Sequence, residues 1–163
     1  MTQLTTLTYE GILTADLATI ENQAGFGKAF LRKVVTFDAG AGTGAVGAVP
    51  LFTVTGAVAI RLVAICTTIL ATQAGATISV GTPAAVAGII AVTTGVDIDA
   101  GDIWFAAAPA TVLDTLANAM IEMVIGNGAD IQADVLVDTI DSGVIEFNLF
   151  WTPLSATGNV VAV

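Results

Sequence analysis

Residues 39–96 carry a single charged side chain, that of Arg61. The rest of this stretch consists of Ala, Val, Ile, Leu, Gly, Thr and a few other neutral residues. Such a segment either crosses a membrane or is buried in a large β-rich core that extends into neighbouring subunits. The core is favoured, because Thr, Gln, Ser, Pro and Gly recur through residues 62–96 and no window of about 19 residues is continuously apolar, as a spanning helix requires. We therefore expect no membrane partner.

The whole chain is poor in charge. Of its 163 residues, 55% are hydrophobic and 11% are charged, whereas soluble domains average roughly 25% charged residues. A monomer of this composition would struggle to cover its surface with polar groups, so burial against copies of itself or another protein is expected. The length favours one domain, which we place at residues 31–163, after a distinct N-terminal segment of residues 1–30.

The few charges are strongly one-sided. There are 14 acidic residues, 4 basic residues and no histidine, which gives a net charge of −10. An acidic chain repels phosphate backbones, so a nucleic-acid partner is not expected. Lys28, Arg32 and Lys33 form the only basic cluster, which we expect to pair with the chain's own carboxylates, an acidic partner being the alternative.

Short apolar runs alternate with turn residues along most of the chain. Turn signals every 8–12 residues predict an all-β fold, an antiparallel β-sandwich or jelly-roll-like barrel of about eight or nine short strands. The predicted strands are residues 31–37, 51–55, 57–66, 77–80, 86–92, 103–107, 119–125, 131–137 and 144–151. Residues 111–123 could begin as a short helix, but we interpret them as a connection that leads into a strand.

Two of these runs alternate most clearly between apolar and other residues. Residues 131–138 place apolar side chains on one face and Asp134 and Asp138 on the other. Residues 144–151 alternate again after Asp141-Ser142-Gly143. The two runs are therefore predicted to form a hairpin around this turn.

The first 30 residues differ from the rest, because they are Thr-rich and their apolar residues are isolated. They are expected to form an extended arm that grips another subunit along a sheet edge, or a terminal strand packed on their own domain. The segment lacks the basic head and apolar core of a secretory signal, which favours cytoplasmic synthesis. The predicted partner-contact residues are Leu4, Leu7, Tyr9, Ile12, Leu13, Leu17, Ile20 and Phe26.

Two motifs could bind small ligands. Residues 42–47 match a dinucleotide-binding glycine pattern, but another β run follows where that motif needs a helix, so a glycine loop is favoured. Asp97, Asp99 and Asp102 could surround a hard cation such as calcium, although an acidic turn between strands is favoured. We predict no cofactor and no metal.

Catalysis is not expected. The chain has no histidine, and its only cysteine, Cys66, lies in an apolar run where it acts as a small buried hydrophobe. The serines have no general base beside them other than carboxylates, and no set of nucleophile, base and orienting group can be named. Trp104 and Trp151 are expected to be core or interface anchors and not a sugar platform.

Six segments spread over residues 30–160 together resemble the sequences of a known group of proteins. They are residues 51–58, 61–68, 76–81, 97–104, 127–131 and 150–155. Here the chain resembles small structural proteins encoded among the virion genes of tailed bacteriophages, and most of all the capsid decoration (cement) proteins. The resemblance implies a non-enzymatic homotrimer on the capsid surface of the virion, with the major capsid protein as its partner. The alternatives are a receptor- or carbohydrate-binding module of a head or tail fibre, and a tail-tube or head–tail connector subunit.

Overall fold

The computed structural model describes residues 29–106, 108–109 and 122–163. These residues form ten strands and one short 3-10 helix, η1 (Gly95–Asp97). The strands are β1 (Ala29–Phe37), β2 (Gly47–Thr55), β3 (Val58–Thr72), β4 (Thr77–Thr82), β5 (Ala85–Thr94), β6 (Ile103–Trp104), β7 (Met123–Ile125), β8 (Ile131–Leu136), β9 (Ile140–Pro153) and β10 (Asn159–Ala162).

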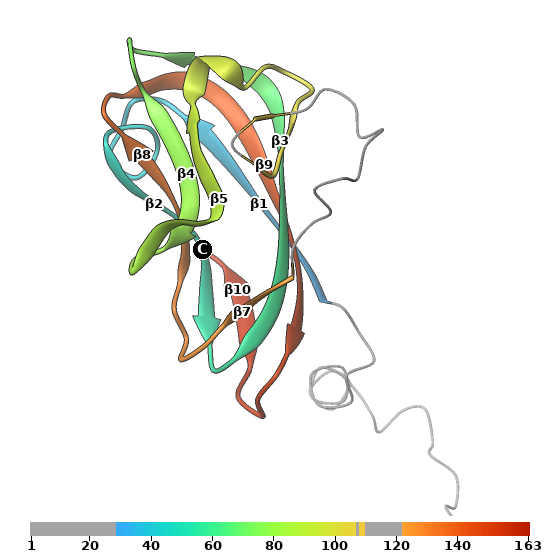
Figure 1. Ribbon diagram of the computed structural model, residues 1–163. Helices are drawn as coiled ribbons and strands as arrows, with labels where there is room; N and C mark the ends of the chain where they lie inside the picture. Colours follow the sequence, from blue (N-terminus) through green and yellow to red (C-terminus); the bar gives the residue numbers. More distant parts are fainter. Residues whose placement is uncertain (1–28, 107, 110–121) are drawn as a thin grey trace, which may run out of the picture.

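The strands build two antiparallel sheets of five strands that face each other (Figure 1). Sheet A has the order β1-β9-β3-β6, and β7 also pairs with β3; sheet B has the order β10-β2-β8-β4-β5. The chain passes between the sheets so that β1, β9, β3 and β6 oppose β2, β8, β4 and β5, which is the order of a jelly roll. The predicted antiparallel sandwich is therefore confirmed.

Each of the nine predicted runs overlaps one strand, whereas β10 was not predicted. Two strands are much longer than expected: β3 has 15 residues and β9 has 14. The end of β3 carries exposed Thr67, Thr68 and Ile69, and its pairing with β9 shifts register there. Exposed threonines next to a register shift lack the alternation that marks a strand in sequence.

The predicted hairpin of residues 131–151 is wrong. Strand β8 pairs with β2 and β4 in sheet B, whereas β9 pairs with β1 and β3 in sheet A. The chain crosses between the sheets after Val137, which has a positive φ of 70°. The expected turn Asp141-Ser142-Gly143 lies inside β9, where it opposes the shifted part of β3. Turn residues in this segment thus mark an irregularity within one strand and not a reversal of the chain.

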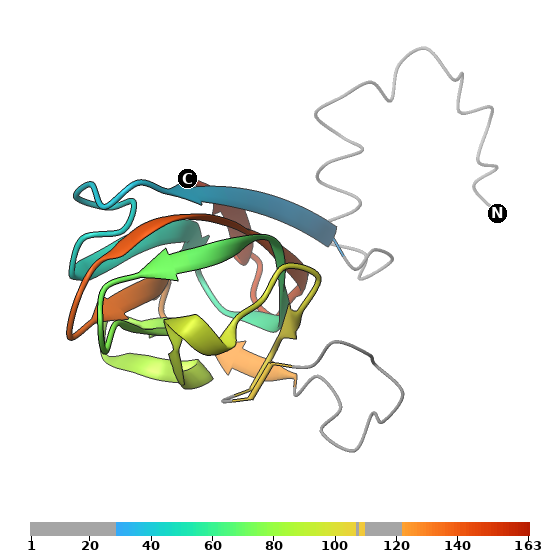
Figure 2. The ribbon, with the colours of Figure 1, turned by 90° about the horizontal axis from the view of Figure 1, so that it is seen from above.

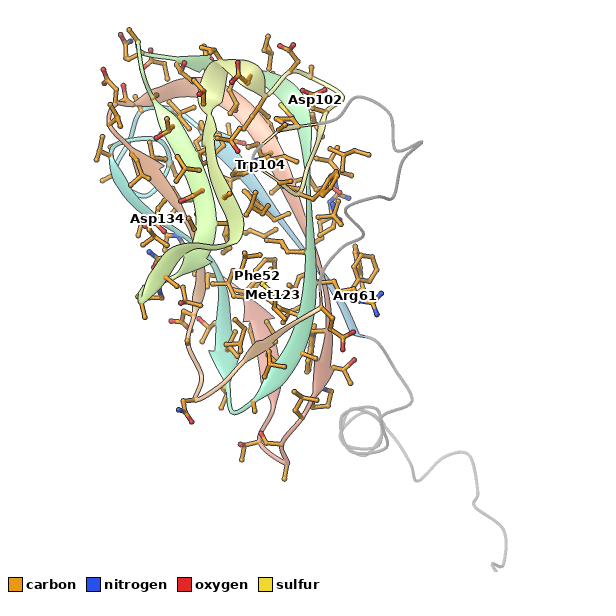
Figure 3. The ribbon with its side chains drawn as sticks, viewed as in Figure 1. Phe52, Arg61, Asp102, Trp104, Met123 and Asp134 are labelled. Carbon is orange, nitrogen blue, oxygen red and sulfur yellow. The ribbon has the colours of Figure 1, made fainter. Side chains whose placement is uncertain are left out.

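The core fills the space between the sheets with alternate residues of nearly every strand. Strand β9 contributes Ile145, Phe147 and Leu149, all fully buried. Trp104 is fully buried: its indole Nε1 donates a hydrogen bond of 2.8 Å to Thr93 Oγ1, and its ring meets that of Phe147 edge-on, with ring centroids 6.4 Å apart. Figure 3 shows Trp104 between the sheets, as expected for a core anchor.

The two sides of the sandwich differ. On one side, β1 and β10 are the neighbouring edges of the two sheets, and Lys33 Nζ of β1 donates a hydrogen bond to the carbonyl of Val163, just after β10. On the other side lie β5, the edge of sheet B, and β7, an edge of sheet A. Figure 2 shows β1 and β7 on opposite sides of the molecule. A side chain thus bridges the two sheets on one side of the sandwich.

Candidate interaction surface

The outward side of sheet A carries several large apolar side chains. We call it the sheet A face, meaning the side chains of β1, β9, β3 and β6 that point away from the core. Phe30 is 51% exposed and Val34 is 45% exposed, and the remaining apolar members are half-buried. These apolar members are Phe30, Val34, Val63, Ile65, Ile103, Val144 and Phe150.

Strand pairing assembles this surface from segments far apart in the chain. Phe30 lies opposite Phe150, and their ring centroids are 5.2 Å apart. Phe150 in turn lies opposite Arg61 of β3. In a parallel row, Glu146 lies opposite both Val34 and Ile65. Asn148 lies in the row between these two, so apolar side chains of three strands alternate with charged and polar ones on this face.

The charges on the sheet A face are paired. Arg32 forms a salt bridge with Glu146 of the neighbouring strand. Arg61 donates hydrogen bonds from Nε and Nη2 to Glu122 Oε2, at 3.2 and 3.0 Å, and Figure 3 shows Arg61 pointing outward from sheet A. Paired charges cost less to cover than isolated ones, so this surface can be buried by a partner.

The outward side of sheet B has a different chemistry. Its central positions carry Thr53, Thr77, Ser79, Gln132 and Asp134. A sheet with one face on the core and one in water carries such polar residues on its outer side. The outer side of sheet A carries large apolar side chains among its charged and polar ones, which makes it a candidate interaction site.

A second candidate lies at the side of the sandwich opposite β1. A cavity of about 310 Å³ opens between β5 and β7. Figure 3 shows Met123 of its lining and the core residue Phe52 in the middle of the molecule. The lining residues are Thr82, Ala85, Gly88, Ile89, Met123, Val124, Ile125, Gly126 and Ala129. No charged side chain is among them.

The predicted partner-contact residues lie outside the described part of the chain. This applies to all eight, Leu4, Leu7, Tyr9, Ile12, Leu13, Leu17, Ile20 and Phe26, and also to Lys28 of the basic cluster. The other two members of that cluster find partners within the chain, since Arg32 pairs with Glu146 and Lys33 binds the carbonyl of Val163. The expected pairing of the cluster with a carboxylate is thus confirmed for Arg32.

The acidic segment of residues 97–102 folds into a closed turn. The backbone N–H of Asp99 donates to Asp102 Oδ2 at 2.9 Å, and that of Asp102 donates to the Asp99 carbonyl at 3.1 Å. The turn is attached to β3 because the N–H of Cys66 donates to the Asp102 carbonyl and that of Gly101 to the Cys66 carbonyl. Within the described residues, no group of three or more acidic, cysteine or histidine side chains could hold a metal ion.

The glycine pattern at residues 42–47 forms a loop and not a nucleotide site. Asp38 organises this loop: its Oδ1 accepts hydrogen bonds from the Gly40 N–H at 2.9 Å and from Thr43 Oγ1 at 2.5 Å. Strand β2 begins directly afterwards at Gly47. A phosphate-binding loop needs a helix N-terminus at this point, so the structure agrees with the simple loop.

Cys66 is fully buried in the core, and burial raises the pKa of its thiol to about 11, with the nearby Asp102 carboxylate adding to the effect. A thiol in this state is a poor nucleophile. Ser79 Oγ donates to the Val86 carbonyl at 2.9 Å, and Ser155 Oγ accepts from the Ala57 N–H at 3.0 Å. These hydroxyls therefore hold backbone segments together.

Sequence reasoning did not identify the sheet A face. One local signal was present, because Val63 and Ile65 make β3 apolar on both of its faces. Strands with two apolar faces are covered on both sides. The contributions of Phe30 and Phe150 required the pairing of β1 with β9, which local sequence does not specify.

Comparison with known proteins yields no match: no family model, no curated protein and no solved structure is significantly similar to the chain. In the described residues, no helix has the length and apolar character needed to cross a membrane.

Proposed function

We propose that this chain is a non-enzymatic structural protein of a virion, which binds the capsid shell as a decoration oligomer and stabilises it through contacts between subunits. The observation that carries the proposal is the sheet A face. Exposed apolar side chains on the outer side of a sheet favour a covering partner, and repetitive assemblies supply one. The capsid as the site of assembly comes from the resemblance of the sequence to decoration proteins.

In this proposal the oligomer is a trimer on the capsid surface, and the major capsid protein is its partner. The paired charges of the sheet A face fit this role, because they let the surface be buried without leaving an isolated charge. The N-terminal segment, with apolar residues from Leu4 to Phe26, supplies further partner contacts. Apolar residues spaced along an extended segment suit binding along a sheet edge or groove.

Capsid attachment tests the function directly. Capsids assembled from the major capsid protein of the same genome are mixed with the full chain and with a chain lacking residues 1–25. The full chain is expected to sediment with capsids and to raise their melting temperature, and the truncated chain is expected to bind more weakly. A full chain that stays in the supernatant at every capsid concentration contradicts the proposal, and unchanged attachment of the truncated chain contradicts the role of its N-terminal segment.

One observation favours a second candidate, a receptor- or carbohydrate-binding module of a fibre. Phe30 and Phe150 form an aromatic pair on the surface, beside the Arg61–Glu122 ion pair. Aromatic rings next to charged groups can bind a sugar or a receptor side chain. Binding to a glycan array that is lost in Phe30→Ala but retained in Val161→Ala, on sheet B, would favour this module. A ring with symmetry other than three in solution would instead favour a tube or connector subunit.

A further inference from the structure

The cavity between β5 and β7 has the size of a binding site for a small molecule. Its volume is about 310 Å³, and ligand pockets in proteins measure roughly 300–1,000 Å³. An apolar cavity of about 150 Å³ is enough to hold one benzene molecule. The cavity of this protein therefore has room for a molecule of roughly ten to twelve non-hydrogen atoms.

The lining of the cavity is almost entirely apolar. Ile89, Met123 and Ile125 supply large side chains, and small residues such as Ala129 leave the space between them open. Val124 of the lining is 67% exposed whereas Ile125 is 7% exposed, so the cavity extends from the surface to the core. An apolar guest would exchange water for apolar contacts there, which is the main driving force for binding in such pockets.

One polar group is placed to orient a guest. Thr82, the last residue of β4, contributes the one side-chain hydroxyl of the lining. This hydroxyl has no hydrogen-bond partner within the part of the chain that the structure describes. A hydroxyl can donate one hydrogen bond and accept two. It can therefore pair with a single hydroxyl or carbonyl group of a ligand.

The electrostatics of the cavity favour an uncharged ligand. No lining residue carries a charge, and the chain as a whole has a net charge of −10. An anion would be repelled by the net charge and would find no cation in the cavity. A cation would lose its hydration without gaining a carboxylate partner. Neither sign of charge is compensated in this site.

We infer that the cavity between β5 and β7 binds an uncharged, mostly apolar small molecule whose single hydroxyl or carbonyl group pairs with Thr82. This inference goes beyond the proposed function and does not depend on it. Loss of ligand binding leaves the capsid function untouched, and failure of capsid attachment leaves the ligand site untouched.

Binding of 2-naphthol to the full chain tests the site. Its two fused rings suit the volume of the cavity, and its one hydroxyl can pair with Thr82. Isothermal titration calorimetry measures the dissociation constant. Naphthalene-2-sulfonate has the same rings but a negative charge, so it is expected to bind roughly tenfold more weakly than 2-naphthol or worse.

Two variants locate the bound molecule. Ala129→Phe fills the cavity and is expected to raise the dissociation constant of 2-naphthol roughly tenfold. Ala100→Phe, the matched control, places the same ring on an exposed turn outside the lining and is expected to change nothing. Thr82→Val keeps the shape of the side chain but removes its hydroxyl. It is expected to weaken 2-naphthol roughly fivefold and to leave the binding of naphthalene, which has no hydroxyl, unchanged.

Three results overturn the inference: no binding of 2-naphthol up to its solubility limit, equal affinities of the Ala129→Phe and Ala100→Phe chains, or an equal affinity for the sulfonate. Equal weakening of naphthalene and 2-naphthol by Thr82→Val contradicts the pairing with the Thr82 hydroxyl. A cooperative thermal melt shows that each variant is folded. Should Ala129→Phe fail to fold, the comparison of the two ligands with Thr82→Val decides.

Discussion

Asp134 is a carboxylate in an unfavourable place. Its side chain is only 6% exposed, Oδ1 accepts a hydrogen bond of 2.8 Å from Gln132, and Oδ2 has no described partner. Burial raises the pKa of Asp134 above its ordinary value of 3.8, and the bond from Gln132 opposes this only in part. The folded protein therefore binds this proton more tightly than the unfolded chain does.

This pKa shift predicts how stability depends on pH. The stabilisation from protonated Asp134 is fully present below pH 3.8 and is lost as the pH rises through the higher folded-state pKa. Asp134→Asn removes the buried charge, so it is expected to raise the free energy of unfolding at pH 7 and change it little at pH 3. Urea titrations at both pH values measure this, with the exposed Asp99→Asn as control. A loss of stability at pH 7 would show that the ionised carboxylate is stabilising.

The two tryptophans form a natural comparison. Both are buried, but Trp104 Nε1 donates to Thr93 whereas Trp151 Nε1 has no described partner. Trp104→Phe is expected to cost about 1–3 kcal/mol more than Trp151→Phe, because it also removes a buried hydrogen bond. Chemical denaturation of the two variants measures the difference. Equal costs would mean that only the lost ring volume matters.

At the scale of the strand, Gly143 keeps β9 continuous through its irregular part. It has a φ of +123°, and a Cβ there would lie 2.6 Å from Leu70 Cδ2 and 2.7 Å from the Ile69 carbonyl oxygen. Gly143→Ala is expected to destabilise the protein by about 1–3 kcal/mol through backbone strain and this clash. Gly126→Ala, where the added Cβ meets nothing, is the matched control in a thermal melt. Equal melting temperatures would show that the paired ends of β3 and β9 accommodate the added Cβ without strain.

The strands were predictable from sequence, but their partners were not. Alternation within a run such as 144–151 reports which residues face the core, and the structure confirms this for Ile145, Phe147 and Leu149. Pairing depends on contacts between segments that are distant in the sequence. Local alternation therefore did not reveal that β8 and β9, which are consecutive in the chain, belong to different sheets. Strand β10 has only four residues, with Val160 as its one buried side chain, and offers too little pattern to detect.

The same limit applies to the candidate surfaces. Apolar residues on both sides of β3 were visible in the sequence, but the row Phe30–Phe150–Arg61 combines residues from three separate strands. The β5–β7 cavity likewise exists only once both sheets are in place. The predicted contact residues at the N-terminus fall outside the described residues and stay predictions.

At the scale of the whole molecule, the contrast between the two outer faces predicts how copies associate. Charged substitutions on the sheet A face, Phe30→Asp with Val34→Lys, are expected to shift the purified protein toward the mass of a single chain, because an apolar contact surface would then carry charge. The matched pair Thr53→Asp with Val161→Lys adds the same two charges, one acidic and one basic, to the sheet B face. Light scattering coupled to size-exclusion chromatography measures both. Dissociation by the sheet B pair alone would reverse the assignment of the faces.

The divided edge of sheet A has a consequence for how this protein can diversify. Strands β6 and β7 pair with the same edge of β3, at Ala64–Ile65 and at Val58–Ile60, and residues 105–122 connect them. Because β6 and β7 both pair with β3, the sheet does not fix the length of the connection between them. Insertions or deletions there would leave the rest of the sandwich in register, so this is the place where homologous chains are expected to differ most and where a foreign sequence could be inserted.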